Sequence, residues 1–241
     1  KVYSLENDTP AALKMLVEQR VAGVIFHAAD FNDCRILALE LKKRGIPIAA
    51  VNCRATIEEC PSFASDDRQG AYEAVHYLFR SGCRKIACMT HRGNFDYIRL
   101  RNEGYFKAMQ ELMPDAEPWI IDSTDFDPRT LTRLLKDPDS RPDAIFCIAD
   151  NHAFHLYQVI YRLGIRVPED ISVIGFGNLS GSSTAMIPLT TVKQEFEGMG
   201  HLAAETVISA VTSKKKMKNE TVELPASILE RESVRNSKTK S

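Results

Sequence analysis

The chain has 241 residues, of which 44% are hydrophobic and 26% are charged, enough to bury the core of one large domain or of two smaller lobes. This composition excludes a chain that is disordered throughout. Its 31 basic and 32 acidic side chains give a formal net charge of -1, so it lacks the broad positive field of a self-sufficient nucleic-acid-binding protein. Any contact with DNA must therefore come from residues outside this sequence.

Targeting signals and cysteines indicate the compartment. No apolar run approaches the roughly 20 residues that span a bilayer, and no apolar leader with a cleavage site is found. The six cysteines lack CxxC spacing and several lie inside apolar runs, which favours buried, reduced thiols over disulfides or zinc ligands. We expect a soluble, cytoplasmic chain.

Short apolar runs alternate with longer amphipathic stretches along the chain. The first helix begins at Thr9 and leads into a buried strand over residues 21–28, and this order of helix and strand then recurs. Further helices are expected over residues 33–45, 70–83, 101–112, 127–137, 151–164 and 198–211, and further strands over 46–52, 84–90, 118–123, 143–150 and 171–177. The pattern predicts an α/β fold of parallel strands joined by crossover helices.

The two ends of the sequence depart from this pattern. Residues 1–7 read as a short strand with no helix before it, so we expect the N-terminal lobe to be truncated by its first strand and helix. Residues 213–218 form a basic segment, which is typical of a solvated connection rather than of a nucleic-acid patch. Residues 234–241 are polar and are predicted to form a flexible tail.

No motif of catalysis or cofactor binding is present. The glycines form neither GxGxxG nor a P-loop, and the pair Gly175 and Gly177 follows a strand but opens no helix. There is no G-x-S-x-G elbow, and acidic pairs such as Asp66 and Asp67 are too common to identify a hydrolase. We therefore predict no catalytic residue, no cofactor and no enzymatic activity.

A metal site has one weak indication. His152 and His155 are three residues apart on a predicted helix, whereas zinc would need a third ligand and usually a pair four residues apart. Ordinary polar helix positions explain both residues better, and no metal is predicted.

Position along the sheet predicts where a ligand would bind. In open α/β sheets, ligands lie beyond the carboxyl ends of the strands, so polar residues that directly follow apolar runs are candidates. These are His27, Asn52, Ser65 and Asp66, residues 90–101, residues 122–126, Ala149 and Asp150, and Gly177 and Asn178. Their mixture of amide, imidazole, guanidinium, carboxylate and aromatic groups suits a small, hydroxyl-rich molecule, although each residue alone is as well explained as a turn or cap.

Residues 170–176 (DISVIGF) and 187–194 (IPLTTVKQ) carry a resemblance to a known family. They resemble the effector-binding domain of the lactose/galactose repressor family, in which such a strand end is followed by a loop and by P-x-L-T-T-[IV]-x-Q. Residues 65–87, 141–176 and 224–233 fit the same family in order and spacing, so that the resemblance covers nearly the whole chain.

The resemblance implies two doubly wound parallel-sheet lobes of the type I periplasmic-binding-protein kind. The N-terminal lobe would comprise residues 1–64 and 195–223, and the C-terminal lobe residues 65–194 and 224–233. A small effector would bind between the lobes, and a helix-turn-helix DNA-binding domain would precede the chain.

The resemblance also implies binding residues. Arg101 stands at the position of the family's hydroxyl-binding arginine, Gln194 at that of its crossover glutamine, and Asn52 replaces a frequent aspartate. Positions whose identity varies with the effector, or that line or border the site, are His27, Tyr97, Phe126, Phe196 and Ser65.

Two departures affect the expected ligand. The family's aspartate after the G-[FY] pair is Gly177 here, and its N-D pair reads Ala149 and Asp150. Losing a carboxylate that binds two hydroxyls removes roughly 1.5 to 3 kcal/mol if nothing substitutes. Asn178 or Asp150 could compensate, the ligand could lack the relevant hydroxyls, or effector sensing could be lost.

The sequence thus predicts the effector-sensing domain of a bacterial transcription regulator, most simply a repressor. It would bind a sugar or sugar derivative, control DNA binding allosterically and form a homodimer. The alternative is a solute-binding protein of a sugar transporter, which shares the architecture. The cysteines without disulfide spacing favour the regulator, and so does the sequence of residues 65–87, which resembles the regulators more than the transport proteins.

Overall fold

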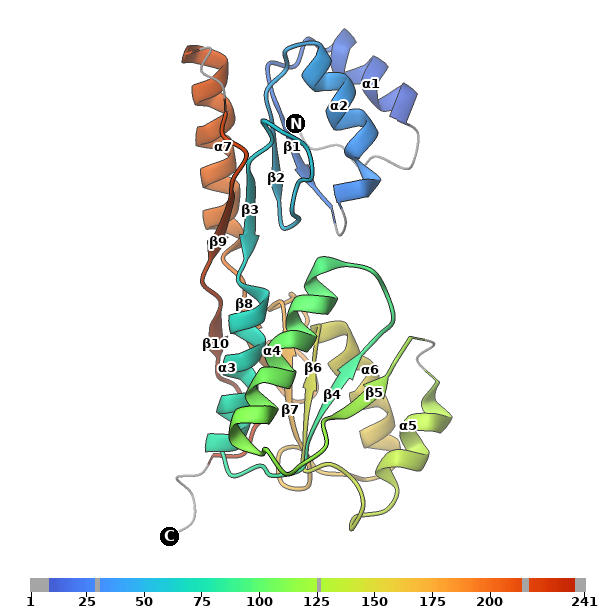
Figure 1. Ribbon diagram of the computed structural model, residues 1–241. Helices are drawn as coiled ribbons and strands as arrows, with labels where there is room; N and C mark the ends of the chain where they lie inside the picture. The colour runs from blue at the N-terminus through green and yellow to red at the C-terminus, as the bar shows by residue number, and fades with distance from the viewer. Residues whose placement is uncertain (1–8, 29–30, 125–126, 214–216, 237–241) are drawn as a thin grey trace. The chain divides into compact units, whose positions relative to one another are not determined.

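A computed structural model of the protein describes residues 9–28, 31–124, 127–213 and 217–236 (Figure 1). The chain divides into two compact units. Unit 1 comprises Lys1–Ser65 and Glu195–Leu224, and unit 2 comprises Asp66–Gln194 and Pro225–Ser241. The chain therefore passes between the units after Ser65, after Gln194 and after Leu224.

Unit 1 is built on a four-stranded parallel sheet with the order β1-β2-β3-β9. Its strands are β1 (Val24–His27), β2 (Ile48–Val51), β3 (Ser62–Ser65) and β9 (Thr221–Leu224). Its helices are α1 (Thr9–Glu18), the short 3-10 helix η1 (Phe31–Asp33), α2 (Arg35–Lys43) and α7 (Phe196–Ser213).

Alternation along β2 explains how unit 1 is layered. Ile48 and Ala50 belong to the apolar cluster that contains residues of α1 and α2, whereas Ala49 and Val51 belong to the cluster that contains residues of α7. Successive side chains of a strand point to opposite faces, so a wholly apolar strand needs a helical layer on each side. Figure 1 shows α1 and α2 on one side of this sheet and α7 on the other.

Unit 2 contains a six-stranded sheet with the order β10-β8-β7-β6-β4-β5, in which only the pairing of β10 with β8 is antiparallel. Its strands are β4 (Ile86–Thr90), β5 (Trp119–Asp122), β6 (Ala144–Cys147), β7 (Ser172–Phe176), β8 (Thr190–Lys193) and β10 (Ser227–Leu229). Its helices are α3 (Asp67–Arg80), α4 (Asp96–Leu112), α5 (Pro128–Leu135) and α6 (Asp150–Arg162). The α/β fold with parallel sheets predicted from the sequence is confirmed.

The sheet of unit 2 is also covered on both faces. Cys88 of β4 lies in the cluster that includes apolar residues of α3 and α4, and its neighbours Ala87 and Met89 lie in the cluster with α5 and α6. The six cysteines, all within the described residues, form no disulfide, and five of them are buried. Among the described residues, no helix combines the length and the apolar character needed to cross a membrane.

The segment after β10 corrects one expectation. Val234 is buried in the core of unit 2, and the Ser233 hydroxyl accepts a hydrogen bond from the Thr190 amide (2.8 Å) and donates one to the Val173 carbonyl (2.6 Å). The prediction of a flexible tail is wrong for Val234 and Arg235, because Val234 is buried and Arg235 donates from its backbone amide to the Ser172 hydroxyl (3.1 Å) and from its guanidinium to the Asp143 carbonyl (3.0 Å). Residues 237–241, the strand expected over residues 1–7 and the centre of the basic segment lie outside the described residues.

A glycine sets the approach of α3 to α4. A β-carbon at Gly104 would lie 2.2 Å from the Arg68 carbonyl oxygen and 2.9 Å from the β-carbon of Ala71. Such distances are well inside van der Waals contact, so the two helices can pack this closely only because residue 104 has no side chain.

We expect Gly104→Ala to destabilise unit 2 by about 1 to 3 kcal/mol, because the extra methyl group overpacks a helix contact. The gain in helix propensity of up to about 1 kcal/mol is too small to offset this loss. Chemical denaturation monitored by circular dichroism measures the change. Gln110→Ala, on the exposed side of the same helix, is the control and should stay within about 0.5 kcal/mol of the parent chain. Equal stability of both variants would contradict the close contact.

Candidate functional site

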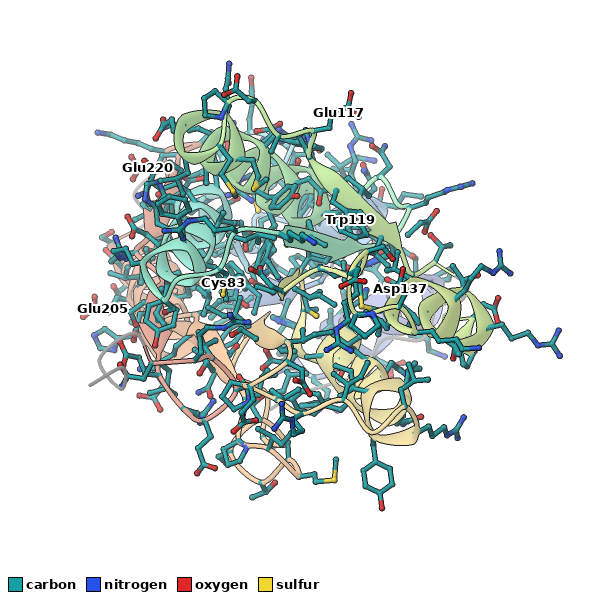
Figure 2. All side chains as sticks on the ribbon, turned by 90° about the horizontal axis from the view of Figure 1, so that it is seen from below. Cys83, Glu117, Trp119, Asp137, Glu205 and Glu220 are labelled. Carbon is teal, nitrogen blue, oxygen red and sulfur yellow. The ribbon has the colours of Figure 1, made fainter. Side chains whose placement is uncertain are left out.

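The carboxyl ends of parallel strands lie at one edge of a sheet, and in each unit the candidate residues lie just beyond these ends. Cys83 precedes β4, Trp119 begins β5 and Asp137 lies between α5 and β6, so these residues mark the amino ends of the strands of unit 2, which Figure 2 shows from below. The candidate residues of unit 2 follow the carboxyl ends, at the opposite edge. This is where ligands bind in open α/β sheets.

Arg101 on α4 is the best-defined polar group of unit 2. Its Nε donates to the Asp67 carboxylate at 2.8 Å, its Nη2 lies 2.7 Å from the same oxygen, and its Nη1 donates to the Ile148 carbonyl at 2.6 Å. The guanidinium carbon lies 3.6 Å from the ring centre of Phe176 and 5.0 Å from that of Tyr97. These contacts use three of the five N–H groups that a guanidinium carries, and they fix its plane.

Gln194 and Asn178 flank the end of β7. Gln194 is buried directly after β8, and its Oε1 is 3.9 Å from the position of a β-carbon at Gly177, where φ is 123°. Asn178 also has a positive φ, 51°, and its side-chain oxygen accepts a hydrogen bond from Arg231 at 2.7 Å. The amide of Gln194 is thus placed beside the glycine that replaces the expected aspartate.

Asp150 does not have the expected role. It is fully buried, and its two oxygens accept hydrogen bonds from the Thr191 hydroxyl (2.6 Å), the Ser182 hydroxyl (2.6 Å) and the Leu179 amide (2.8 Å). The predicted contact of Asp150 with an effector is therefore wrong, because this carboxylate binds the loop after β7 and the strand β8. A carboxylate with three donors is a structural anchor.

Unit 1 carries four of the predicted residues. His27 is the exposed last residue of β1. Asn52 follows the neighbouring strand β2 with a φ of 59°, and its backbone N–H donates to the Phe63 carbonyl at 2.8 Å. Ser65 ends β3 and is buried, and Phe196 begins α7 with 40% of its surface exposed. His27 and Asn52 therefore share the carboxyl edge of this sheet, and Phe126 lies outside the described residues.

Two histidines meet at this edge of unit 2: His91, which lies in the candidate segment 90–101, and His152, which the sequence suggested only as a weak metal ligand. His91 follows β4, and its Nδ1 is 3.1 Å from Nε2 of the buried His152 on α6. The other ring nitrogen of His91 is 3.4 Å from the hydroxyl of Tyr97. His91 directly follows β4, the position that marked its segment as a candidate, whereas His152 lies in the first turn of α6, and nothing in the sequence indicated that the two rings meet.

The charges at this edge are already neutralised. Asp67 pairs with Arg101, and Asp122 at the end of β5 pairs with Arg92 at 2.7 Å. Hydrogen bonds from Thr124, with the nearby charge of Arg92, lower the pKa of Asp122. Among the described residues, no group of three or more histidine, cysteine and acidic side chains could hold a metal ion. The edge presents guanidinium, amide, imidazole and phenol groups beside aromatic rings, a set that suits a neutral polar molecule with an apolar face.

Comparison with known proteins identifies the family. A family model described as periplasmic binding protein-like domain matches residues 75–234. The HTH-type transcriptional repressor PurR of Aliivibrio salmonicida is 30% identical over 207 residues, which are 84% of this chain and 61% of the relative. A dimeric Lac repressor has a similar fold, with a TM-score of 0.76 and 23% identity over 94% of this chain and 82% of that one. A LacI family regulator from Enterococcus faecium with bound ribose has a TM-score of 0.78 and 22% identity over 97% and 86%.

The chain belongs to the periplasmic binding protein-like domain family, as an effector-binding domain of the lactose/galactose repressor type. The family resemblance seen in the sequence is thereby confirmed. The chain spans 61% of the length of the PurR relative.

The burial of His152 can be tested through the pH dependence of stability. Burial lowers the pKa of His152 to about 4, below the value of about 6.5 in an unfolded chain. The unfolded chain therefore binds this proton first as the pH falls, and stability is lost between about pH 6.5 and 4. At pH 4.5 this loss is on the order of 2 kcal/mol.

We expect the free energy of unfolding of the parent chain to fall between pH 7 and pH 4.5 by that amount more than it does in His152→Gln, which cannot titrate. Urea unfolding at a series of pH values measures the difference. Parallel curves for the two proteins would contradict the burial of a neutral imidazole.

Proposed function

We propose that this chain is the effector-sensing domain of a bacterial transcription repressor. A small polar molecule, a sugar or sugar derivative, binds at the carboxyl edges of the sheets and controls DNA binding by a helix-turn-helix domain outside these residues. The protein acts in the cytoplasm and catalyses no reaction.

The observation that carries this proposal is the guanidinium of Arg101. Asp67 and the Ile148 carbonyl hold it rigidly at the end of the sheet, against the face of Phe176. A preorganised arginine loses little entropy when it binds hydroxyl groups, and the adjacent ring offers an apolar face to a sugar. The similarity to repressors, one of them the PurR relative, supports a regulator over a transport protein.

The effector class follows from the groups that are available. Asp150 is occupied by three donors and the Asn178 oxygen by Arg231, so neither replaces the carboxylate missing at Gly177. Hydroxyl binding then depends on neutral groups and on Arg101. Ribose bound to the Enterococcus faecium regulator supports a neutral sugar.

Regulation requires that the effector bind two states of the domain with different affinity. A coupling of about 1 to 3 kcal/mol changes DNA affinity roughly 5- to 150-fold. The net charge of -1 fits a domain that leaves phosphate attraction to another part of the protein.

Calorimetry of the folded chain against neutral sugars including ribose, sugar phosphates and nucleobases should detect a ligand. For that ligand, Arg101→Lys should weaken binding at least about tenfold, because lysine keeps the charge opposite Asp67 but lacks the planar fork.

Arg99→Lys is the matched control. Arg99 lies on the same helix, is exposed and pairs with Asp96 and Glu103, so this change should alter affinity less than about twofold. A folded chain that binds no member of the panel would contradict the proposed function.

The homodimer is proposed to form through unit 2. A hollow of about 460 Å³ lies between α6 and the loop after β7, lined by Phe154, Tyr157, Gln158, Tyr161, Gly181, Thr184, Ala185 and Met186. Tyr161 and Met186 are 70% and 63% exposed, which is unusual for large apolar side chains. The dimeric state of the similar Lac repressor supports a second copy as the occupant.

Met186→Glu and Tyr161→Glu should shift the chain from dimer to monomer in sedimentation-velocity measurements, because each buries a charge in the interface. Ile208→Glu on α7, where the side chain is 60% exposed, is the control and should leave the dimer intact. Dissociation by the control alone would place the interface elsewhere.

A further inference from the structure

The loop between β7 and β8, residues 177–189, forms one wall of the hollow that is proposed above as the dimer interface. The lining residues that belong to this loop are Gly181, Thr184, Ala185 and Met186, and the others belong to α6. A β-carbon at Gly181 would lie 3.2 Å from Cζ of Phe154, so the loop backbone lies against an aromatic ring of α6. The shape of the hollow therefore depends on where this loop is held.

Arg231, shortly after β10, connects the two ends of the loop. Its Nη2 donates to Oδ1 of Asn178 at 2.7 Å, and its Nη1 donates to the Leu189 carbonyl at 2.5 Å. Its backbone N–H donates to the Thr190 hydroxyl oxygen at 2.9 Å, which fixes the arginine beside β8. A guanidinium is planar and carries only donors, so one rigid group sets the distance between the two acceptors of the loop.

Asp150, in the first turn of α6, holds the interior of the loop. Its Oδ2 accepts from the Leu179 backbone N–H at 2.8 Å and from the Ser182 hydroxyl at 2.6 Å, and its Oδ1 accepts from the Thr191 hydroxyl at 2.6 Å. Within the loop, the Ser182 N–H donates to the Leu179 carbonyl, and the Leu189 N–H donates to the Ser182 carbonyl, both at 2.8 Å. The loop is thus bonded to the same helix that supplies the other wall of the hollow.

The distribution of polar and apolar side chains in the loop suits a binding surface. Leu179 and Met186 are exposed, whereas the polar Ser182 is buried. Polar contacts therefore hold the loop in place, while large apolar side chains remain accessible to a partner. A surface that is already held in its binding shape loses less conformational entropy when a partner binds.

Arg235 offers a comparison that separates this role from a general contribution to stability. It lies on the same C-terminal segment and is half-buried, as Arg231 is. Its backbone N–H donates to the Ser172 hydroxyl oxygen at 3.1 Å, and its Nη2 donates to the Asp143 carbonyl at 3.0 Å. Ser172 begins β7 and Asp143 directly precedes β6, so Arg235 bonds the amino edge of the sheet rather than the loop.

We propose that Arg231 and Asp150 are positioning residues of the dimer surface, which hold loop 177–189 in the shape that a second copy of this chain binds. Neither residue lines the hollow, so both act through the loop. The segment after β10 thereby controls the oligomeric state. This inference rests on the homodimer of the proposed function and adds which residues prepare its surface.

Sedimentation velocity over a range of concentrations measures the dimer dissociation constant of the full chain. Arg231→Lys should raise this constant at least about tenfold, because an ammonium group cannot hold both acceptors in one plane and the second copy must then order the loop. Arg235→Lys makes the same change outside the loop and should alter the constant less than about twofold. Asn178→Gly tolerates the φ of 51° and removes one acceptor, so it should weaken the dimer as Arg231→Lys does.

Amide hydrogen exchange, at a concentration where the chain is monomeric, distinguishes positioning from direct contact with the partner. The amides of Leu179, Ser182 and Leu189 should exchange faster in Arg231→Lys than in the parent chain, while those of β7 keep their protection. In Arg235→Lys the loop amides should exchange as in the parent. A weakened dimer with unchanged exchange in the loop overturns the positioning role.

The outcomes separate this inference from the proposed function. A parent chain that stays monomeric overturns the proposed homodimer and this inference with it. A dimeric parent whose dissociation constant is unchanged in Arg231→Lys and Asn178→Gly overturns the inference alone. Circular dichroism checks that each variant folds, and Asn178→Gly carries the same prediction if Arg231→Lys does not.

Discussion

The buried pair of Arg101 and Asp67 is the interaction on which the carboxyl edge of unit 2 depends. It connects α4 to the start of α3, and the bond from Arg101 to the Ile148 carbonyl extends the connection to the end of β6. A buried charge pair is tolerated when further hydrogen bonds satisfy its groups, and removing one partner is costly because the other charge stays buried. The same pair therefore holds the packing of two helices and the orientation of a binding group, so that stability and recognition cannot be varied independently at this position.

Asp150 and the contact of His91 with His152 also stabilise this edge of unit 2. The Asp150 carboxylate occupies the space beside Gly175, where a β-carbon would be 2.2 Å from its oxygen, and it fixes the loop that carries Asn178. Both Asp150 and His152 are in the first turn of α6. The first turn of α6 thus holds the loop after β7 through the Asp150 carboxylate and contacts His91, after β4, through the His152 imidazole. These contacts explain why polar residues are buried here.

The sequence was sufficient to predict the alternation of helices and strands, because wholly apolar strands and amphipathic helices have different periods. It also marked the segment after β4, residues 90–101, as a place for binding residues, and this segment contains Arg101. It could not predict the role of Asp150, since a carboxylate after a strand looks the same whether it faces a ligand or three hydroxyl and amide donors. Nor could it predict the contact of His91 with His152, which are 61 positions apart. The burial of Val234 was missed because a single apolar residue in a polar segment gives no periodic signal.

The three passages of the chain between the units have a consequence for biosynthesis. Unit 1 needs α7 and β9, and unit 2 needs β10 and the hydroxyl of Ser233, which bonds to both Thr190 and Val173. Domains generally fold as units while the ribosome delivers the chain from its N-terminus. Here the sheet of unit 1 is incomplete until β9 is translated and the sheet of unit 2 until β10 is, so termination before residue 221 would leave two incomplete sheets rather than one finished lobe.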